Sequence, residues 1–179
     1  MAQPRFETLF REQLEALYNA EKQIAAALPK MIAIASTEEL SSLLQSHLGE
    51  TNEQAVRLEQ IFEAMGEEPA VRESVGMKGL ILECDGLMSR LDKGALLDVS
   101  LIWAAQKIEQ YEICGYSSVQ AIAEILGQQG FADLLEEAIE EEKAADENFW
   151  ELAESIVERA NGIEDEIPME QEISEPYRR

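Results

Sequence analysis

The feature that most constrains the fold is a carboxylate in the middle of an apolar helical stripe. Between Leu101 and Leu126, apolar residues recur at steps of three and four, which keeps them on one face of a helix. Glu112 interrupts that face between Ile108 and Val119. Because a fully buried Glu is rare unless it is paired or bound, this pattern predicts a polar site inside a helical core.

Three other segments show the same pattern. The apolar stripes of residues 6–35, 40–65 and 134–160 contain, in turn, Glu21, Glu50 and Glu142 near their middles. Together with Glu112, each of four long helices therefore contributes a carboxylate. One such residue alone is equally well explained as a surface side chain, but four of them favour a shared buried site.

The spacing of these carboxylates predicts that they lie at one level. Glu21 and Glu50 are equidistant from the turn expected near residues 35–36. Glu112 and Glu142 are equidistant from Gly127, which separates their helices. Each Glu is about 15 residues from its turn, or roughly 22 Å at a rise of about 1.5 Å per residue. Two antiparallel hairpins would then place all four carboxylates in one layer.

The chain has 179 residues, which is enough for one domain with a sizeable core. No segment alternates strictly between apolar and polar residues, so the predicted class is all-α. Residues 67–95 form a long crossover containing a short helix near 79–91. A long crossover between two helical hairpins predicts a ferritin-like four-helix bundle over residues 1–162. Residues 163–179 read as an acidic C-terminal tail, whose partner the sequence does not indicate.

The formal net charge of −23 argues against nucleic acids and anionic membrane surfaces as partners, since both require a basic face. No segment is apolar enough to span a bilayer, and the N-terminus lacks the apolar region of a signal peptide. Cys84 and Cys114 match no metal or redox spacing and are expected to be buried thiols. We therefore expect a cytoplasmic protein.

Four carboxylates in a low-dielectric core cannot all remain ionised without compensation. Either they take up protons or they bind cations, and two divalent ions would neutralise four Glu. Bundles with such di-metal centres use one Glu from each of two helices and a Glu plus a His from each of the other two. The sequence therefore predicts a di-metal carboxylate centre.

Further candidate ligands lie one turn from these Glu residues. They are Glu109 before Glu112, Asp146 after Glu142, and His47 and Gln54 on either side of Glu50. Asp146 competes with Ala145 for the core position, and His47 is explained equally well as a hydrogen-bonded core residue. Because the usual Glu-x-x-His pattern is absent, a mostly oxygen shell is expected. Such a shell suits iron or manganese and also admits magnesium or calcium.

Four segments also carry a resemblance: LFREQLEALYNAEKQIAAALPKM, HLGETNEQ, AAQKIEQYEICGY and LLEEAIEEEKAADE. They resemble the YciE/YciF family of bacterial ferritin-like, rubrerythrin-like stress-response proteins over about residues 5 to 160. The resemblance implies a bundle with a di-metal, di-iron-type centre and a homodimeric assembly. Members of that family often carry His where this chain has Gln110, and His near Gln54.

The expected function is therefore metal binding by a ferritin-like protein that handles iron, oxygen or peroxide during stress. The alternative is a metal-free helical interaction or scaffold protein with an acidic surface, in which some core carboxyls are protonated. The sequence itself indicates neither a reaction nor a substrate, so enzymatic activity is left open.

Overall fold

The computed structural model describes residues 5–70 and 72–164, which form five helices and, over those residues, no strand. The helices are α1 (Phe6–Ile34), α2 (Glu38–Met65), α3 (Val75–Met88), α4 (Ala95–Ile125) and α5 (Gln129–Glu164). The predicted all-α class is confirmed, and the short crossover helix is α3. None of these helices is long and apolar enough to cross a membrane.

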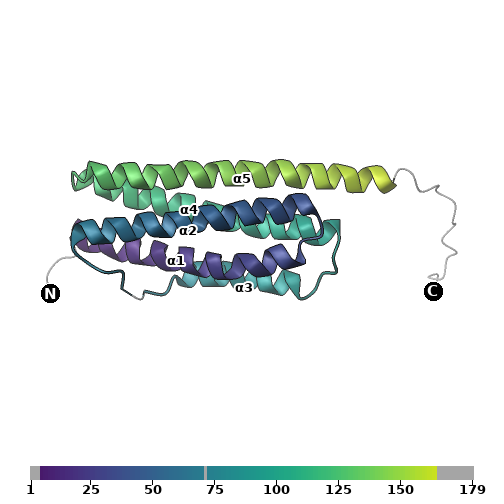
Figure 1. The fold of residues 1–179 in the computed structure, drawn as a ribbon, viewed down its shortest axis with the longest axis horizontal. Helices are drawn as coiled ribbons and strands as arrows, with labels where there is room; N and C mark the ends of the chain where they lie inside the picture. Colours follow the sequence, from purple (N-terminus) through teal and green to yellow (C-terminus); the bar gives the residue numbers. More distant parts are fainter. Residues whose placement is uncertain (1–4, 71, 165–179) are drawn as a thin grey trace, which may run out of the picture.

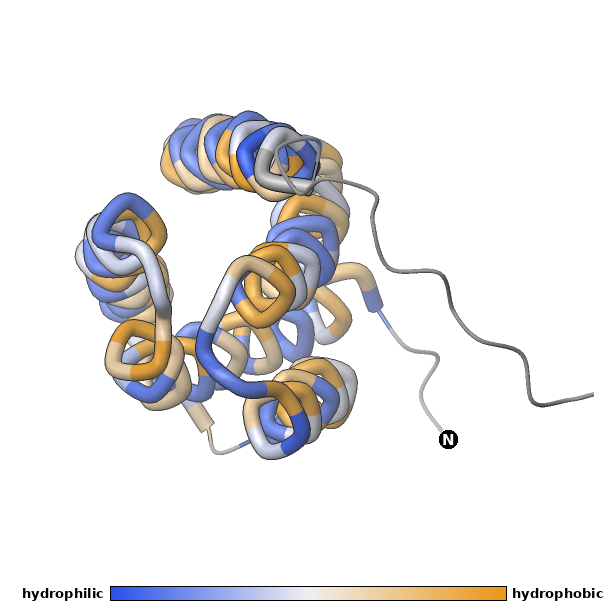
Figure 2. The backbone as a smooth tube through the Cα atoms, turned by 90° about the vertical axis from the view of Figure 1, so that its right-hand side faces the viewer, coloured by the Kyte–Doolittle hydropathy of each residue, from blue (hydrophilic) through white to orange (hydrophobic). Residues whose placement is uncertain are grey.

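Two antiparallel hairpins, α1–α2 and α4–α5, pack side by side into a four-helix bundle (Figure 1). Helix α1 contacts α4, and α2 contacts α5, so the four helices form a closed ring. The crossover helix α3 lies outside this ring against α1 and α4. Figure 2 shows hydrophilic and hydrophobic residues alternating along each tube, as expected for amphipathic helices around one core.

The apolar core has two parts, one toward each end of the bundle. One part includes Leu28, Leu44, Leu101 and Phe149, and the other includes Phe10, Leu58, Val119 and Leu135. Buried polar side chains of all four bundle helices lie between the two parts. The predicted polar layer is therefore sandwiched between two apolar clusters.

Close packing brings α1 and α4 together at this level. A Cβ atom added to Gly115 would lie 2.8 Å from Cδ2 of Leu17, which is too close for any larger residue without movement. Leu17 therefore packs directly against the α4 backbone, and this side of the bundle is closed by apolar contact.

Thr37 caps α2, since its hydroxyl accepts a hydrogen bond from the Leu40 amide. Two helix boundaries differ from the sequence predictions. Helix α3 begins at Val75, about four residues earlier than expected. Helix α5 continues past Gly162 to Glu164, and the rest of the predicted tail lies outside the described residues.

The early start of α3 is explained by hydrogen bonds around Ser74, which is buried. Its amide donates to the Asn19 side chain at 2.7 Å, and its carbonyl accepts from Gln23 at 3.1 Å. Its hydroxyl lies 2.9 Å from the Tyr111 hydroxyl of α4. These contacts fix the crossover chain to α1 and α4 just before α3 begins.

A buried carboxylate joins the two hairpins at one end of the bundle. Asp98, in the first turn of α4, is fully buried. One of its oxygens accepts from the Ser36 amide at 2.7 Å. The other accepts from the amide and the hydroxyl of Thr37, both at 2.9 Å. The turn between α1 and α2 is thereby tied to α4.

Replacement of Asp98 by Ala should destabilise the bundle, because two backbone amides and the Thr37 hydroxyl would lose their acceptor and a cavity would form at a fully buried position of α4. We expect the free energy of unfolding to fall by about 2–4 kcal/mol. Urea unfolding followed by circular dichroism measures this change. Asp92→Ala, which removes an exposed carboxylate in the preceding loop, should have little effect. Equal stability of the two variants would contradict the role assigned to Asp98.

Candidate metal centre

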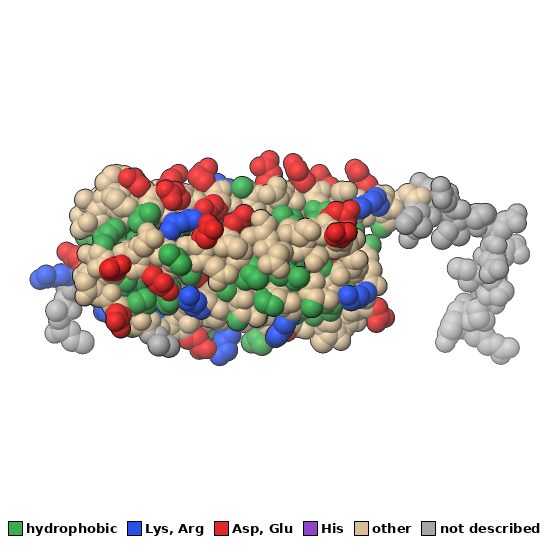
Figure 3. Space-filling model, in the orientation of Figure 1, with side chains coloured by type: hydrophobic (Ala, Val, Ile, Leu, Met, Phe, Trp, Pro, Cys, Tyr) green, Lys and Arg blue, Asp and Glu red, His purple; other side chains and the backbone are tan. Residues whose placement is uncertain are grey.

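Four buried side chains converge in the polar layer. They are His47 from α2, Glu109 and Glu112 from α4, and Glu142 from α5. Each offers one ligand atom, and these four atoms all lie within 4.8 Å of one another. None of the four residues is more than 3% exposed. Figure 3 accordingly shows no histidine on the face it presents. We refer to these four residues as the core group.

Helix α1 contributes Glu21, which is fully buried beside the core group. The hydroxyl of Tyr116, also buried, donates a hydrogen bond to a Glu21 oxygen. Glu21 also lies near Glu112, since burial, and after it the charge of Glu21, raises the pKa of Glu112. All four bundle helices therefore contribute to one polar layer, as the sequence predicted.

Most of the carboxylate oxygens in this layer lack a hydrogen-bond donor. Both oxygens of Glu109 and Glu112, and one oxygen each of Glu21 and Glu142, are buried without a partner. Loss of hydration raises the pKa of Glu21 to about 8, and the charge of Glu142 adds to this effect. Burial and the neighbouring carboxylates also hold the pKa values of Glu109 and Glu112 well above the ordinary value. The layer therefore favours uptake of protons or cations.

His47 spans the core between α2 and α4. Its Nε2 atom lies 3.2 Å from Oε1 of Glu109, although the two groups are poorly aligned for a hydrogen bond. The ring packs edge-on against Phe149, with centroids 5.9 Å apart. The imidazole is thus held within the carboxylate cluster, as expected for one nitrogen ligand in an oxygen-rich site.

The prediction that Glu50 lies in the core is wrong. Its side chain is 40% exposed and accepts a weak hydrogen bond from Ser46 at 3.5 Å. The buried face of α2 runs through His47, Thr51 and Gln54 instead. Thr51 can be buried because its hydroxyl donates to the His47 carbonyl at 2.8 Å. The fourth buried carboxylate comes from Glu109 on α4.

Asp146 also lies outside the core group. It is half-buried and accepts hydrogen bonds from Gln106 at 3.3 Å and from Gln110 at 2.8 Å. Ala145 occupies the core position in its place. Asp146 therefore links α5 to α4 at the side of the bundle rather than facing the core group.

Two polar residues of α2 border the group on its other side. The side-chain amide of Gln54 donates to Glu142 and, at 3.1 Å, to Glu141. Arg57 pairs with Glu141. Gln54 was a sequence candidate, whereas Arg57 was not identified. Arg57 follows Gln54 by three residues, which places the two side chains on one helix face. That spacing is the sequence signal that could have identified Arg57.

Comparison with known proteins places the chain in a family. A family profile described as a domain of unknown function, DUF892, matches residues 5–161. The protein YciF of Escherichia coli K12 is 40% identical over 148 residues, which are 82% of this chain and 89% of YciF. The chain belongs to the YciF family.

Similar solved structures have the same fold. The crystal structure of the E. coli stress protein YciF matches with a TM-score of 0.84 and 38% identity, over 87% of this chain and 99% of that one. A Rhodopseudomonas palustris protein, YcfI, named as a structural protein, matches with a TM-score of 0.79 and 38% identity, over 82% and 93% of the two chains. A Xanthomonas campestris protein matches at 0.73 with 20% identity, over 90% and 99%, and shows the fold alone.

The raised pKa of Glu21 predicts how stability depends on pH in metal-free protein. Glu21 ionises near its ordinary value of 4.5 when unfolded and near 8 when folded. Its contribution to stability is therefore complete below about pH 4.5 and is lost as the pH rises through 8. The loss is on the order of 5 kcal/mol. Thermal melts in the presence of chelator should show a falling Tm between pH 5 and pH 8.

A matched pair of variants separates this effect from general charge repulsion. Glu21→Gln keeps an oxygen acceptor for Tyr116 and removes the buried ionisation, so its Tm should depend less on pH. Glu140→Gln removes one exposed carboxylate of α5 and should keep the wild-type slope. Parallel pH profiles for wild type and Glu21→Gln would contradict the assignment.

Proposed function

We propose that this protein binds two divalent metal ions, iron or manganese, in the centre of its bundle. The observation that carries this proposal is the core group, where one nitrogen and three carboxylate ligand atoms lie within 4.8 Å of one another. Such a cluster of buried, mostly unpartnered oxygens is costly to maintain unless cations or protons compensate it.

Charge balance favours two ions rather than one. Glu21, Glu109, Glu112 and Glu142 are buried in one layer and would carry four negative charges when ionised. Two divalent ions supply four positive charges. The core group and Glu21 would together hold the two ions.

The ligand set favours hard or borderline metals. Carboxylate oxygens with a single imidazole suit iron and manganese better than the soft metals that prefer thiolates. Two such redox-active ions would supply electrons for reducing oxygen or peroxide. This proposal agrees with the description of E. coli YciF as a stress protein. We therefore propose stress-related handling of iron, oxygen or peroxide in the cytoplasm.

The surrounding residues orient the carboxylates. Tyr116 donates to one oxygen of Glu21 and leaves the other free. Gln54 acts in the same way on Glu142. Hydrogen bonds of this kind fix the direction of a ligand and increase metal affinity.

Metal binding should stabilise the folded protein. Manganese(II) at about one hundred times its Kd should add about 2.7 kcal/mol, which raises Tm by several degrees in a domain of this size. Glu112→Ala should abolish this shift, whereas Glu53→Ala, which removes an exposed carboxylate of α2, should keep it. Scanning calorimetry and metal analysis by plasma mass spectrometry provide the measurements.

The rival function is a metal-free scaffold with protonated core carboxyls. The naming of the R. palustris relative as a structural protein favours it. In that case, metal would leave Tm unchanged, and Glu112→Ala would stabilise the protein by removing a buried carboxyl. A metal content well below one ion per chain after anaerobic iron(II) loading would decide for the scaffold.

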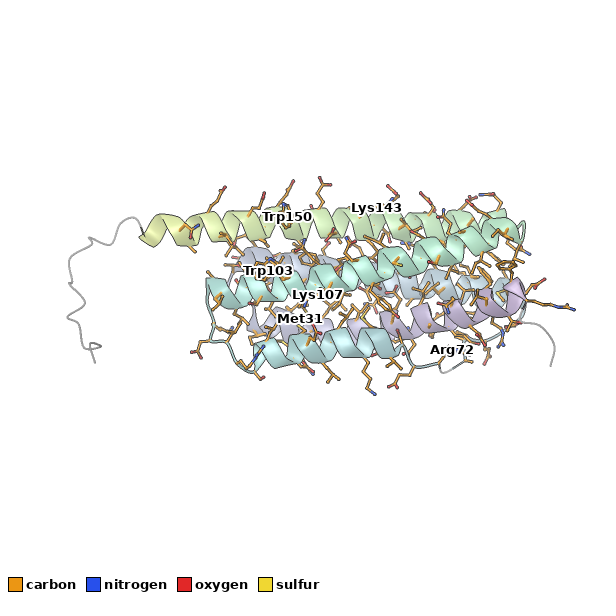
Figure 4. The ribbon with its side chains drawn as sticks, turned by 180° about the vertical axis from the view of Figure 1, so that it is seen from behind. Met31, Arg72, Trp103, Lys107, Lys143 and Trp150 are labelled. Atoms are coloured by element: carbon orange, nitrogen blue, oxygen red, sulfur yellow. The ribbon has the colours of Figure 1, made fainter. Side chains whose placement is uncertain are left out.

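We also propose that two chains associate into a homodimer, the assembly implied by the family resemblance and the commonest oligomeric symmetry. Trp103 of α4 and Trp150 of α5 are each about half exposed, and they lie at a similar height along their helices (Figure 4). Large aromatic side chains of this kind are enriched in protein interfaces. Light scattering after size exclusion should give twice the chain mass, and the mass of a single chain would contradict the proposal.

A further inference from the structure

A continuous series of polar side chains leads from the core group to the surface between α2 and α5. Glu142 is fully buried and accepts from Gln54, which is 1% exposed. Gln54 also donates to Glu141, whose side chain is 32% exposed. Arg57 pairs with Glu141 and lies 3.9 Å from Glu137, whose side chain is 64% exposed. We call Gln54, Arg57, Glu137 and Glu141 the α2–α5 polar series.

Other approaches to the core group are less favourable for an ion. Apolar clusters cover the group toward both ends of the bundle. Between α1 and α4, Leu17 packs on Gly115, and the surface hollow beside them is lined by uncharged residues. Between α4 and α5, Asp146 is bound by the amides of Gln106 and Gln110, and these bonds do not extend to the core group.

Two atoms of the α2–α5 polar series are buried without a partner. Oε1 of Gln54 and Nη1 of Arg57 both lack hydrogen bonds, although Gln54 lies directly beside Glu142. An unpaired buried carbonyl oxygen is unfavourable, yet it can replace part of the hydration shell of a passing cation. The series therefore contains an oxygen suited to a cation at its innermost point.

Arg57 occupies the middle of the series. Its side chain is 14% exposed, and its guanidinium lies between Glu141, which also contacts Gln54, and the outermost carboxylate, Glu137. In this position, the guanidinium opposes the passage of a cation. When the guanidinium moves outward, it no longer opposes that passage.

The surface outside Arg57 is strongly acidic. A hollow along α5 is lined by Asp133, Glu136, Glu137, Glu140 and Glu141. Figure 3 shows acidic side chains along the upper edge of the molecule, where α5 runs. Such a surface raises the local concentration of divalent cations.

We propose that metal ions reach and leave the core group between α2 and α5, and that Arg57 gates this route. This inference rests on the proposed metal-binding function. Arg57 controls the barrier to exchange rather than acting as a ligand, because it touches Glu141 and Glu137 and not the core group.

The kinetics of manganese(II) exchange test this role in the full chain. Stopped-flow mixing with an excess of a fluorescent chelator measures release, and mixing of metal-free protein with manganese(II) measures uptake. Arg57→Gln should accelerate release and uptake at least fivefold each. Arg72→Gln gives the same net charge, but Arg72 lies beside α3, away from α5, and pairs with Glu12 and Glu15 (Figure 4). It should leave both rates unchanged.

The direction of the change in release distinguishes gating from simple electrostatics. Loss of a nearby positive charge would strengthen metal binding and slow release, whereas loss of a gate accelerates release. Slower or unchanged release in Arg57→Gln, with metal still bound, overturns the gate and leaves the proposed function intact. Wild-type protein that binds no manganese(II) overturns the proposed function and the route with it.

A second variant guards against loss of folding. Glu141→Gln keeps the guanidinium and removes the carboxylate that anchors it, so release should again accelerate. Circular dichroism confirms the helical content of each variant. If Arg57→Gln does not fold, unchanged release in folded Glu141→Gln overturns the gate.

Discussion

The cost of dehydrating four carboxyl groups in one layer is the constraint on which the rest of this structure depends. Glu21, Glu109, Glu112 and Glu142 are buried to the same degree as the apolar residues around them. Asp98 is equally buried, but backbone amides and a hydroxyl satisfy its oxygens. Glu15 is also buried, and its two oxygens accept from Arg11 and Arg72. The four carboxylates of the layer differ because six of their eight oxygens have no partner, so they are the ones that require a ligand.

Much of this arrangement could be predicted from sequence because helices are periodic. Steps of three and four residues placed Glu21, Glu112 and Glu142 correctly in the core, and hairpin symmetry placed them at one level. The same periodicity failed for Glu50, where rotation by one residue brings Thr51 inward instead. Adjacent residues differ by about 100° around a helix. Where the apolar stripe of a helix contains several small or polar residues, the sequence therefore locates the centre of the buried face only to within one residue.

The remaining contacts depend on how the hairpins meet, which local patterns do not encode. Gln54 and Glu142 are 88 positions apart in the chain, and Ser36 and Asp98 are 62 apart. Neither pairing follows from spacing within a helix. The two hairpins must first be docked at a defined height before such partners can be named. The spacing from Gln54 could place Arg57 on the same face of α2, but its pairing with Glu141 of α5 depends on how the hairpins dock.

The contact of Leu17 with Gly115 makes the two sides of the bundle mechanically unequal. Where α1 meets α4, a side chain lies directly on bare backbone, and little room is left for relative movement. Where α2 meets α5, ionic and amide groups fill the space, and water can substitute for them at low cost. Thermal fluctuations should therefore separate α2 from α5 more readily than α1 from α4, with the two hairpins rotating about the α1–α4 contact.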